Sequence, residues 1–447
     1  MSNSFDVRGR ALKADELAAW LSEHSLGNRF GLTVAAAGVS YDAKAVAVAI
    51  VAADGDGRFI RIADLTADDE AALASWLADP GPPKAVHDAK FAMHALAARG
   101  WTLRGVTSDT VLAAHLLLPE RRNFALNDLL VRHMRCALPT EAVEQQHFAA
   151  QTRPGGTDQR AAQALILQAC AVLDLADVLD EELARIDSSS LLGRLELPVQ
   201  RVLAGMETAG IAVDRALLSR LDGAGPVQAA VAELLSSIAA DRRVHATFHQ
   251  TTTTSRISSS QPNLHELPAL PGRSLHDAFV VGDGYAELMV AGYRHLEARI
   301  VAHLIGDADV RTVVDEARRL GYAATLSGRR RYLADLDSND RQARETAERA
   351  AVFTSIQGSA ADIIKVAMIN VDQVIGAVGL KSRLVLQVDD QLVFEAAEGE
   401  RDTLAAYVHE QMSCAYSLDV PLQVSIGSGP TWNMAAPADP PGSHIRE

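Results

Sequence analysis

Hydrophobic and polar residues follow alternating strand-like and helix-like patterns over residues 1–190. Two apolar runs rich in valine and alanine, Phe30–Ala36 and Ala45–Ala52, are typical of buried strands. The spacing of apolar residues predicts helices at Asp68–Ala78, Ala89–Arg99, Asp109–Leu118 and Arg160–Ile186. Strands that alternate with helices in this way predict an α/β domain.

A polar cluster at Asp187–Ser190 predicts a joint, after which the pattern changes. Helices are expected at Leu191–Ala209, Val227–Ala240, Glu297–Leu304 and Arg341–Gln373, the last interrupted near Thr354–Gln357. A polar segment with strand character covers Phe248–Ser260, and a strand-like run covers Ala286–Ala291. Two further apolar runs, Ser382–Val388 and Leu392–Ala396, flank three polar residues and predict a β-hairpin.

Composition and charge narrow the class of protein. The chain has 447 residues, which is too long for one ordinary core, so two or more domains are expected. Hydrophobic residues make up 48% and charged residues 22%, which is typical of a globular protein. The net charge of -15 argues against unspecific binding to nucleic acid, although a local basic cleft on an acidic body would suffice for DNA.

The cysteines and the apolar segments predict a soluble protein of the reducing cytoplasm. Cys136, Cys170 and Cys414 are isolated, which argues against a disulfide framework or a structural zinc site. Residues Met1–Arg10 lack the apolar core of a signal peptide. The apolar stretch Ala45–Ala53 is too short to span a bilayer, so no membrane association is expected.

The second half carries a string of motifs in one order. They read T-T-T-T-S-R-I-S-S-S-Q-P-N-L-H-E-L-P from Thr251, G-Y-R-H-L-E-A-R from Gly292, A-H-L-I-G-D from Ala302, T-L-S-G-R-R-R-Y-L from Thr325, A-E-R from Ala347, I-Q-G-S-A-A-D-I-I-K from Ile356 and L-V-L-Q-V-D-D-Q-L-V-F from Leu384. In this order they resemble the polymerase domain of bacterial family A DNA polymerases, whereas one motif alone would be weak. The first half resembles the proofreading exonuclease domain of that family more faintly, at Val86–Ala92 and Leu103–Ala113.

The resemblance implies a fold and a division of the chain. It implies an α/β protein with a ribonuclease H-like domain of the 3'-5' exonuclease type at residues 1–190. Shortened thumb-like helices would follow at 191–245, and a palm with an antiparallel sheet and helices at 246–435. Residues 436–447, rich in proline and glycine, are expected to form a disordered tail.

Nucleotide addition in this family uses two divalent cations held by one aspartate of each of two motifs. The first position is Gly292 here, whereas the second aspartate remains as Asp390. Beside it, Asp389 replaces the histidine of the family and Gln391 replaces its glutamate. Neighbouring residues at a hairpin tip point in different directions, which favours a solvated turn at Asp389 and Asp390. A metal site rebuilt from Asp390 with Asp389 stays open as the alternative.

Two subdomains of the family are also reduced. In the family, a fingers segment that seats the incoming nucleotide follows A-H-L-S-G-D, but here Asp307 leads almost directly to Val310–Tyr322. The thumb is short because few residues separate Val213 from Arg243–Phe248. The fingers are therefore expected to be largely missing, and the thumb to be a stub.

The exonuclease half has lost carboxylates in the same way. Leu32–Ala37 offers no acidic pair, and Ala92 stands where a second motif of the family has aspartate. The third motif would fall at Leu165–Ala171, where the residues are apolar. Asp109 remains, but one carboxylate cannot hold two cations. Proofreading activity is expected to be lost.

The resemblance also implies residues that contact DNA. The expected contacts are Arg256, Asn263, Arg349, Gln357 and the basic run Arg329, Arg330 and Arg331, which suits phosphate oxygens. For that run, surface pairing with nearby glutamates is an equally good interpretation. Departures from the family pattern are Ser255, His265, Glu266 and Phe353, the last in place of asparagine. Glu297, the ribose-selecting position of the family, is expected to be structural and to pair with Arg299.

These observations give a leading hypothesis and two rivals. The leading hypothesis is a DNA-binding relative of the family A polymerases that acts on primer–template or duplex DNA in replication or repair and has lost both activities. It would need no cofactor and would lie in the cytoplasm at the nucleoid. The first rival is an active minimal DNA polymerase that uses Asp390, Asp389 and Mg²⁺. The second is a protein-interaction scaffold that does not bind DNA.

Overall fold

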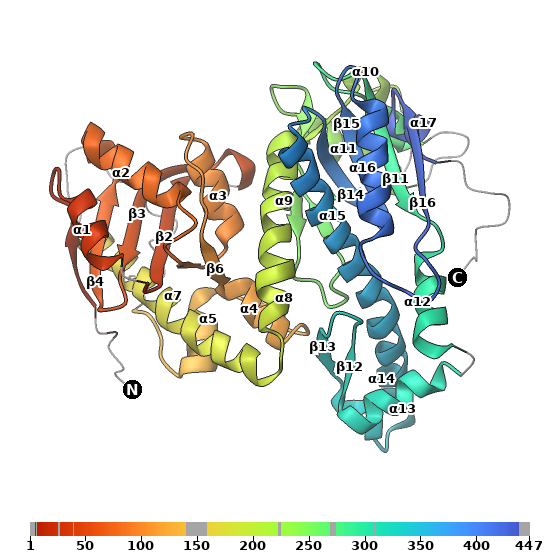
Figure 1. The fold of residues 1–447 in the computed structure, drawn as a ribbon, viewed down its shortest axis with the longest axis horizontal. Coiled ribbons are helices and arrows are strands. Elements are labelled where there is room, and N and C mark those ends of the chain that lie inside the picture. The colour runs from red at the N-terminus through yellow and green to blue at the C-terminus, as the bar shows by residue number, and fades with distance from the viewer. Residues whose placement is uncertain are drawn as a thin grey trace. The chain divides into compact units, whose positions relative to one another are not determined.

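The computed structural model describes most of the chain. It covers residues 5, 7–25, 27–38, 40–139, 159–221, 225–268, 274–306 and 309–437. The chain divides into two compact units, Met1–Ala204 and Gly205–Glu447 (Figure 1). The expected tail at 436–447 lies outside the described residues beyond residue 437.

The first unit is built on one mixed sheet. Its strands are β1 (Arg8–Ala11), β2 (Phe30–Ala37), β3 (Lys44–Val51), β4 (Asp56–Arg61), β5 (Lys84–Val86) and β6 (Val106–Asp109), in the order β1-β4-β3-β2-β5-β6. Strand β3 is antiparallel to β2 and β4, whereas β5 is parallel to β2 and β6. The two strands expected from the apolar runs are therefore confirmed, and so is the α/β class of this half.

Helices cover both faces of this sheet. They are α1 (Leu17–His24), α2 (Ala67–Ala78), α3 (Ala89–Ala97), α4 (Thr110–Leu117), α5 (Leu126–Leu129) and α7 (Gln159–Arg185). Alternate residues of β3 enter two different apolar clusters, because successive strand side chains point to opposite faces: Val48 and Ile50 on one side, Ala49 and Val51 on the other. This explains why β3 reads as an unbroken apolar run.

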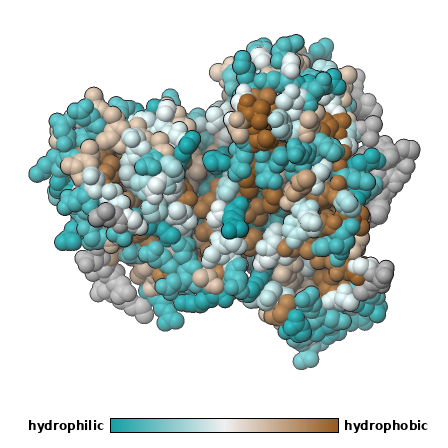
Figure 2. Space-filling model, viewed as in Figure 1, coloured by the Kyte–Doolittle hydropathy of each residue, from teal (hydrophilic) through white to brown (hydrophobic). Residues whose placement is uncertain are grey.

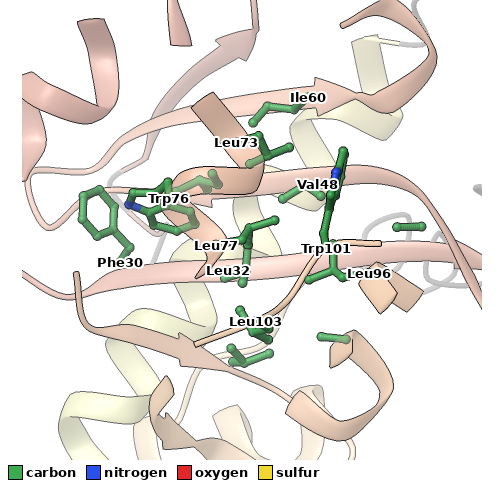
Figure 3. Close-up of a cluster of buried hydrophobic side chains, with 14 of the residues drawn as sticks. Phe30, Leu32, Val48, Ile60, Leu73, Trp76, Leu77, Leu96, Trp101 and Leu103 are labelled. Atoms are coloured by element: carbon green, nitrogen blue, oxygen red, sulfur yellow. The ribbon is translucent and has the colours of Figure 1, made fainter. Parts of the chain in front are cut away.

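Figure 3 shows the larger of these clusters. Phe30 meets Trp76 edge to face, with ring centroids 5.3 Å apart. The fully buried Lys84 places its ammonium 4.5 Å from the centre of the Trp76 ring and donates to the carbonyls of Asp79 and Pro82. Burial lowers the pKa of Lys84 to about 8.

Helix α7 packs on the other face of the sheet, against β2 and β3. A Cβ atom at Gly31 would lie 2.0 Å from the carbonyl oxygen of Ala169, so the close approach of α7 to β2 requires glycine. By length and composition α7 is the one described helix that would be able to cross a membrane, but 72% of its apolar window is buried inside the structure. The core helix of a folded domain gives the same pattern, so α7 is weak evidence for a membrane span.

The second unit begins with short helices and strands. They are β7 (Ile211–Ala212), α10 (Arg215–Leu218), α11 (Pro226–Ser237), β8 (Arg243–Val244), β9 (Thr247–His249) and β10 (Ser258–Ser260). In sequence they follow α8 (Ser189–Leu191), a π-helical turn at Leu192–Glu196 and α9 (Leu197–Ala209). The described helices between α9 and β8 are thus α10 and α11, and the thumb-like role of this segment stays a prediction.

The centre of the second unit is an antiparallel sheet. Its strands are β11 (Glu287–Tyr293), β14 (Arg383–Val388), β15 (Gln391–Ala396) and β16 (Val424–Gly429), in the order β14-β15-β11-β16. Helices α15 (Ser359–Val378) and α16 (Arg401–Ser413) pack against it, and α12 (Leu296–Ile305) packs against α15. This arrangement confirms the expected palm-like sheet with helices and the predicted hairpin.

A small arm extends the second unit. It contains α13 (Arg311–Leu320), β12 (Tyr322–Ala324), β13 (Arg330–Tyr332) and α14 (Arg341–Phe353). Its core is a cluster of small and aliphatic side chains around Ala317, Ala323 and Leu336. Figure 2 shows mostly hydrophilic residues over this arm. A π-helical turn at Thr354–Gly358 separates α14 from α15, which confirms the interruption predicted in the long helix.

Candidate active site

The end of β11 and the β14–β15 turn meet at one edge of the palm-like sheet. Gly292 pairs with Gln391 in the antiparallel register, and Asp389 and Asp390 form the two-residue turn. Asp389 has a positive φ of 51°, which aspartate tolerates better than most residues. The backbone amide of Tyr293 donates to the carbonyl of Asp390 at 3.1 Å, so the turn is fastened to β11.

A cavity of about 630 Å³ opens at this edge. Among the residues that line it are Arg256, Gly292, Glu297, Asp389, Asp390 and Gln391. The cavity therefore contains both positions that hold metal in the resembled family, and it brings together residues from three separate motifs.

The side chain of Gln391 lies beside the backbone of Gly292 in this cavity. A Cβ atom at Gly292 would lie 3.2 Å from Cγ of Gln391, so the glutamine side chain lies against the space that a residue at 292 would use. Gln391 carries no charge, and Gly292 carries no side chain. Neither Gly292 nor Gln391 therefore supplies a carboxylate to the cavity.

Asp390 is the remaining motif aspartate. Burial raises its pKa to about 6, the negative charges of Asp389 and Glu297 act in the same direction, and Arg256 opposes them. Within the part of the chain that the structure describes, no group of three or more histidine, cysteine or acidic side chains is placed to hold a metal. Asp390, Asp389 and Glu297 are therefore the carboxylates of this cavity, and Asp390 is the one motif aspartate among them.

Arg256 and Glu297 form an ion pair across the mouth of the cavity. Nη2 of Arg256 lies 2.5 Å from Oε1 of Glu297, and both side chains are nearly half exposed. This corrects the expectation that Glu297 pairs with Arg299. Arg299 instead donates to the carbonyls of Arg294 and Pro421, because those carbonyls lie beside the start of α12.

The three arginines of the basic run, Arg329 and the first two residues of β13, have three different environments. Arg329 is buried and donates through Nε and Nη2 to Oδ1 of Asp362, at 3.2 and 2.8 Å. It is therefore a structural cation rather than the phosphate contact expected from the sequence, because its charge is neutralised inside the unit. Arg330 lies 4.8 Å from the centre of the Tyr322 ring. Arg331 donates to Thr354 at 3.4 Å, and DNA contact by Arg330 and Arg331 remains a prediction.

The other expected DNA contacts are accessible to different degrees. Asn263 is half-buried and donates to Glu266 at 3.1 Å. Gln357 is half-buried in the π-helical turn, and Arg349 is exposed on α14. Burial lowers the pKa of His265, whose ring nitrogen lies 2.7 Å from the hydroxyl of Ser259. These contacts stay predictions, but each of the three side chains reaches the surface.

The remnant carboxylate of the first unit has become structural. Asp109 is fully buried and accepts hydrogen bonds from the amides of Ala89, Val111 and Leu112 and from the side chain of Gln200. Burial raises the pKa of Asp109, and the nearby charge of Asp88 adds to this effect. Asp109 joins β6, α3, α4 and α9 in this way and is not available to a metal.

Three features of these sites were not found from the sequence. They are the contact between Gln200 and Asp109, the contact between Gln391 and the space at Gly292, and the pairing of Arg256 with Glu297. The strand register contains a signal for the contact between Gln391 and the space at Gly292, because Gly292 falls opposite Gln391 once the hairpin and β11 are aligned. The other two join elements far apart in the sequence and leave no local signal.

Comparison with known proteins places these features in a family. The family described as DNA polymerase family A matches residues 224–314 and 309–434, and the DNA polymerase I ribonuclease H-like domain matches residues 33–143. DNA polymerase I of Mycobacterium tuberculosis H37Rv is 40% identical over 595 positions, which cover 98% of this chain and 66% of the relative. DNA polymerase I of Mycobacterium leprae is 39% identical, with the same coverage of each chain.

A solved structure is similar over nearly the whole length. The POL domain of Pol1 from M. smegmatis, in complex with DNA primer-template and dNTP, superposes with a TM-score of 0.87 and 43% sequence identity. The similarity covers 96% of this chain and 100% of that chain. This chain spans about two thirds of the length of the M. tuberculosis and M. leprae relatives.

The alignments also locate what is missing. The alignment with the M. tuberculosis relative runs over 595 positions, more than the 447 residues of this chain, so the relative has residues inside the aligned region that this chain lacks. The family match divides at residues 309–314, where the sequence predicts the loss of the fingers segment. The match and the sequence motifs thus agree on the position of the gap.

Proposed function

This chain belongs to DNA polymerase family A, and on that premise we propose that it binds primer–template or duplex DNA without extending or proofreading it. The observation that carries the proposal is the geometry at Gly292. The strand position that should supply the second carboxylate has no side chain, and the neutral Gln391 lies against that space. A two-metal displacement needs ligands for both cations, and Asp390 alone does not supply them.

Three residues support the binding half of the proposal. Arg256 lies at the cavity mouth, and Arg349 and Gln357 lie on the helical segment that leads into α15. Arg256 keeps 42% of its side chain exposed despite its ion pair, so it retains donors for a phosphate or a base edge. The similar M. smegmatis structure contains a DNA primer-template, which favours DNA as the ligand of this framework.

The role that follows is in replication or repair, in the cytoplasm at the nucleoid. A protein that holds a primer end without extending it would protect the end or mark it for other enzymes. No cofactor is required for this role, and Mg²⁺ would bind only if the catalytic alternative were correct.

That alternative is an active minimal polymerase, and one observation favours it. Asp389 and Glu297 line the same cavity as Asp390, so three carboxylates surround one space. The relatives named above are DNA polymerases I, which also favours it. Against it stand the exposed position of Asp389 at the tip of the turn and the ion pair that engages Glu297.

The test has two parts on the same purified chain. Binding to a labelled primer–template is measured at increasing salt, and we expect affinity that falls steeply with salt. Arg256→Ala should weaken binding several-fold, whereas Arg401→Ala should leave it unchanged. Arg401 is a suitable control because it is also an exposed arginine paired with one glutamate, at 3.4 Å.

Primer extension separates the two candidate functions. With all four deoxynucleotides and Mg²⁺ or Mn²⁺, the proposal predicts no extension. Extension that disappears in Asp390→Ala would establish the polymerase instead. The absence of binding at low salt would contradict the proposal and favour the protein-interaction scaffold.

A further inference from the structure

A second cavity lies in the arm, apart from the one that contains Asp390. It has a volume of about 330 Å³, at the small end of the range for ligand pockets. It lies between α13 and α14 and is lined by Val314, Glu345, Glu348, Arg349, Val352 and Phe353. Its size suits one planar ring system better than a length of chain.

Phe353 makes this cavity unusual. It is the last residue of α14, and 51% of its surface is exposed. It does not belong to the apolar cluster of the arm, whose α14 members are Ala347 and Ala351. Phenylalanine also replaces the asparagine of the family pattern at this position. An exposed aromatic ring beside an apolar cavity is costly in water and is typical of a binding surface.

The charges around the cavity leave one cation uncommitted. Glu345 is paired with Arg341 at 2.6 Å, and Glu348 is paired with Arg318 at 2.8 Å. Arg349 donates to the hydroxyl of Thr346, at 3.3 Å, and its charge helps to lower the pKa of Glu345, but it forms no ion pair within 4 Å of a residue that the structure describes. The lining thus combines an aromatic face, two valines, the guanidinium of Arg349 and two glutamates that are each paired with another arginine.

These groups lie on one side of the helix. Arg349 precedes Phe353 by four residues on α14, so the two side chains succeed each other at close to one turn, and both line the cavity. Aromatic rings and guanidinium groups spaced in this way are the elements with which proteins hold unpaired nucleic-acid bases.

We propose that this cavity binds an unpaired nucleobase of DNA, stacked on the ring of Phe353, with Arg349 directed to its phosphate. This inference rests on the proposed DNA-binding function and names the DNA structure that it prefers. Every base has a face that can stack, so the site would not select sequence. A base without a partner is the least costly to remove from the helix, so bulges and mismatches would bind best.

The experiment uses the full chain and two labelled duplexes that differ by one extra, bulged 2-aminopurine. Dissociation constants are measured by fluorescence anisotropy at one fixed salt concentration. Base–aromatic stacking predicts about tenfold tighter binding of the bulged duplex. Phe353→Ala should reduce that ratio to about one and abolish the change in 2-aminopurine emission that accompanies binding, because the base then has no ring of the protein on which to stack. Phe353→Trp should retain both effects.

Val378→Ser is the matched control, since Val378 is also an exposed apolar residue at the end of a helix, at 46%. It should change neither the ratio nor the emission. Equal affinity for the two duplexes would overturn this inference, and so would a preference for the bulged duplex that survives Phe353→Ala. Either result would leave the proposed DNA binding intact. An aromatic anchor for a protein partner would then be the better account of Phe353. Failure to bind either duplex would overturn the proposed function as well.

Discussion

Asp109 in the first unit and Asp390 in the second are both remnants of family carboxylate motifs, yet their surroundings differ. Asp109 is fully buried and accepts four hydrogen bonds from three segments of its unit. Asp390 lines an open cavity beside two further carboxylates, with its pKa raised to about 6. Among the described residues, one motif aspartate is hydrogen-bonded inside the framework, whereas the other lies in the lining of a cavity.

The difference teaches where function can persist after catalytic residues are lost. A carboxylate that is satisfied by backbone amides stabilises the fold and has nothing left to offer a ligand. Under the proposed function, a cavity that lacks a carboxylate at Gly292 but has Arg256 in its lining would bind a nucleic acid. The proposed function places DNA binding in the second unit. The following predictions test this contrast between the two aspartates, from the largest expected effect to the smallest.

The largest effect is expected for the buried ion pair between Arg329 and Asp362 in the second unit. Arg329→Ala leaves Asp362 charged and without its cation, which should cost about 3–5 kcal/mol of unfolding free energy. Arg330→Ala on the same strand should cost less than about 1 kcal/mol, because Arg330 is half-buried and contacts a ring face. Urea unfolding followed by circular dichroism measures both. Equal losses in the two variants would show that Arg329 is not the structural cation.

Asp109→Ala should be the next most damaging change. It leaves the amides of Ala89 and Leu112 and the side chain of Gln200 without their acceptor, at a cost of about 2–4 kcal/mol. The same urea experiment should show the loss in the unfolding of the first unit. If Asp109→Ala were neutral in stability but changed a metal-dependent nuclease activity, the first unit would have kept its chemistry, and the contrast would fail.

Asp390→Asn should raise the free energy of unfolding rather than lower it. The folded pKa of about 6 is higher than the unfolded value of 3.8, so folding favours the protonated form. The stability of the wild-type chain should therefore fall as the pH rises from about 4 to about 6 and stay lower above that range. At pH 7 the asparagine variant should be more stable by about 1–2 kcal/mol, after allowance for solvent screening. Thermal unfolding at pH 4, 5, 6 and 7 would reveal a gap that opens with pH.

Gly292→Asp should produce the smallest change in stability. The new Cβ would meet only the flexible Gln391 side chain at 3.2 Å, so it can be accommodated, and the added charge beside Asp390 should cost about 1 kcal/mol without metal. Addition of Mn²⁺ should recover the lost stability of Gly292→Asp but have no effect on the stability of Gly292→Ala. Recovery in both variants would mean that the cation binds elsewhere.

Much of the fold was predictable because its signals are local. The long helix after Arg341, its interruption before Ser359, and the hairpin at Asp389 follow from periodicity and turn residues. Strand β16 (Val424–Gly429) was missed because two of its six residues are glycine and its polar residues interrupt the apolar pattern. Helix α16 lacks a clear apolar face and was missed for a related reason.

The sequence predicted which side chains of the family pattern are replaced at the candidate site, but it predicted fewer of the contacts between the side chains that are present. Motif order located Gly292 and Asp390, because those positions are fixed by the resemblance alone. The sequence did not indicate which arginine of the run at 329–331 is buried, since this depends on Asp362, which arrives from α15. It did not indicate the partner of Glu297 either, because Arg256 comes from a distant loop. Pairing between elements remote in sequence requires the structure.

The most direct test of the central claim is a calorimetric titration of the wild-type chain with Mn²⁺, alongside Asp390→Asn. We predict that the wild-type chain binds no pair of cations at the β11–hairpin edge, and that its titration is indistinguishable from that of Asp390→Asn. Binding of two Mn²⁺ ions per wild-type chain that is lost in Asp390→Asn would contradict the account. It would show that a new set of ligands has replaced the missing carboxylate at Gly292.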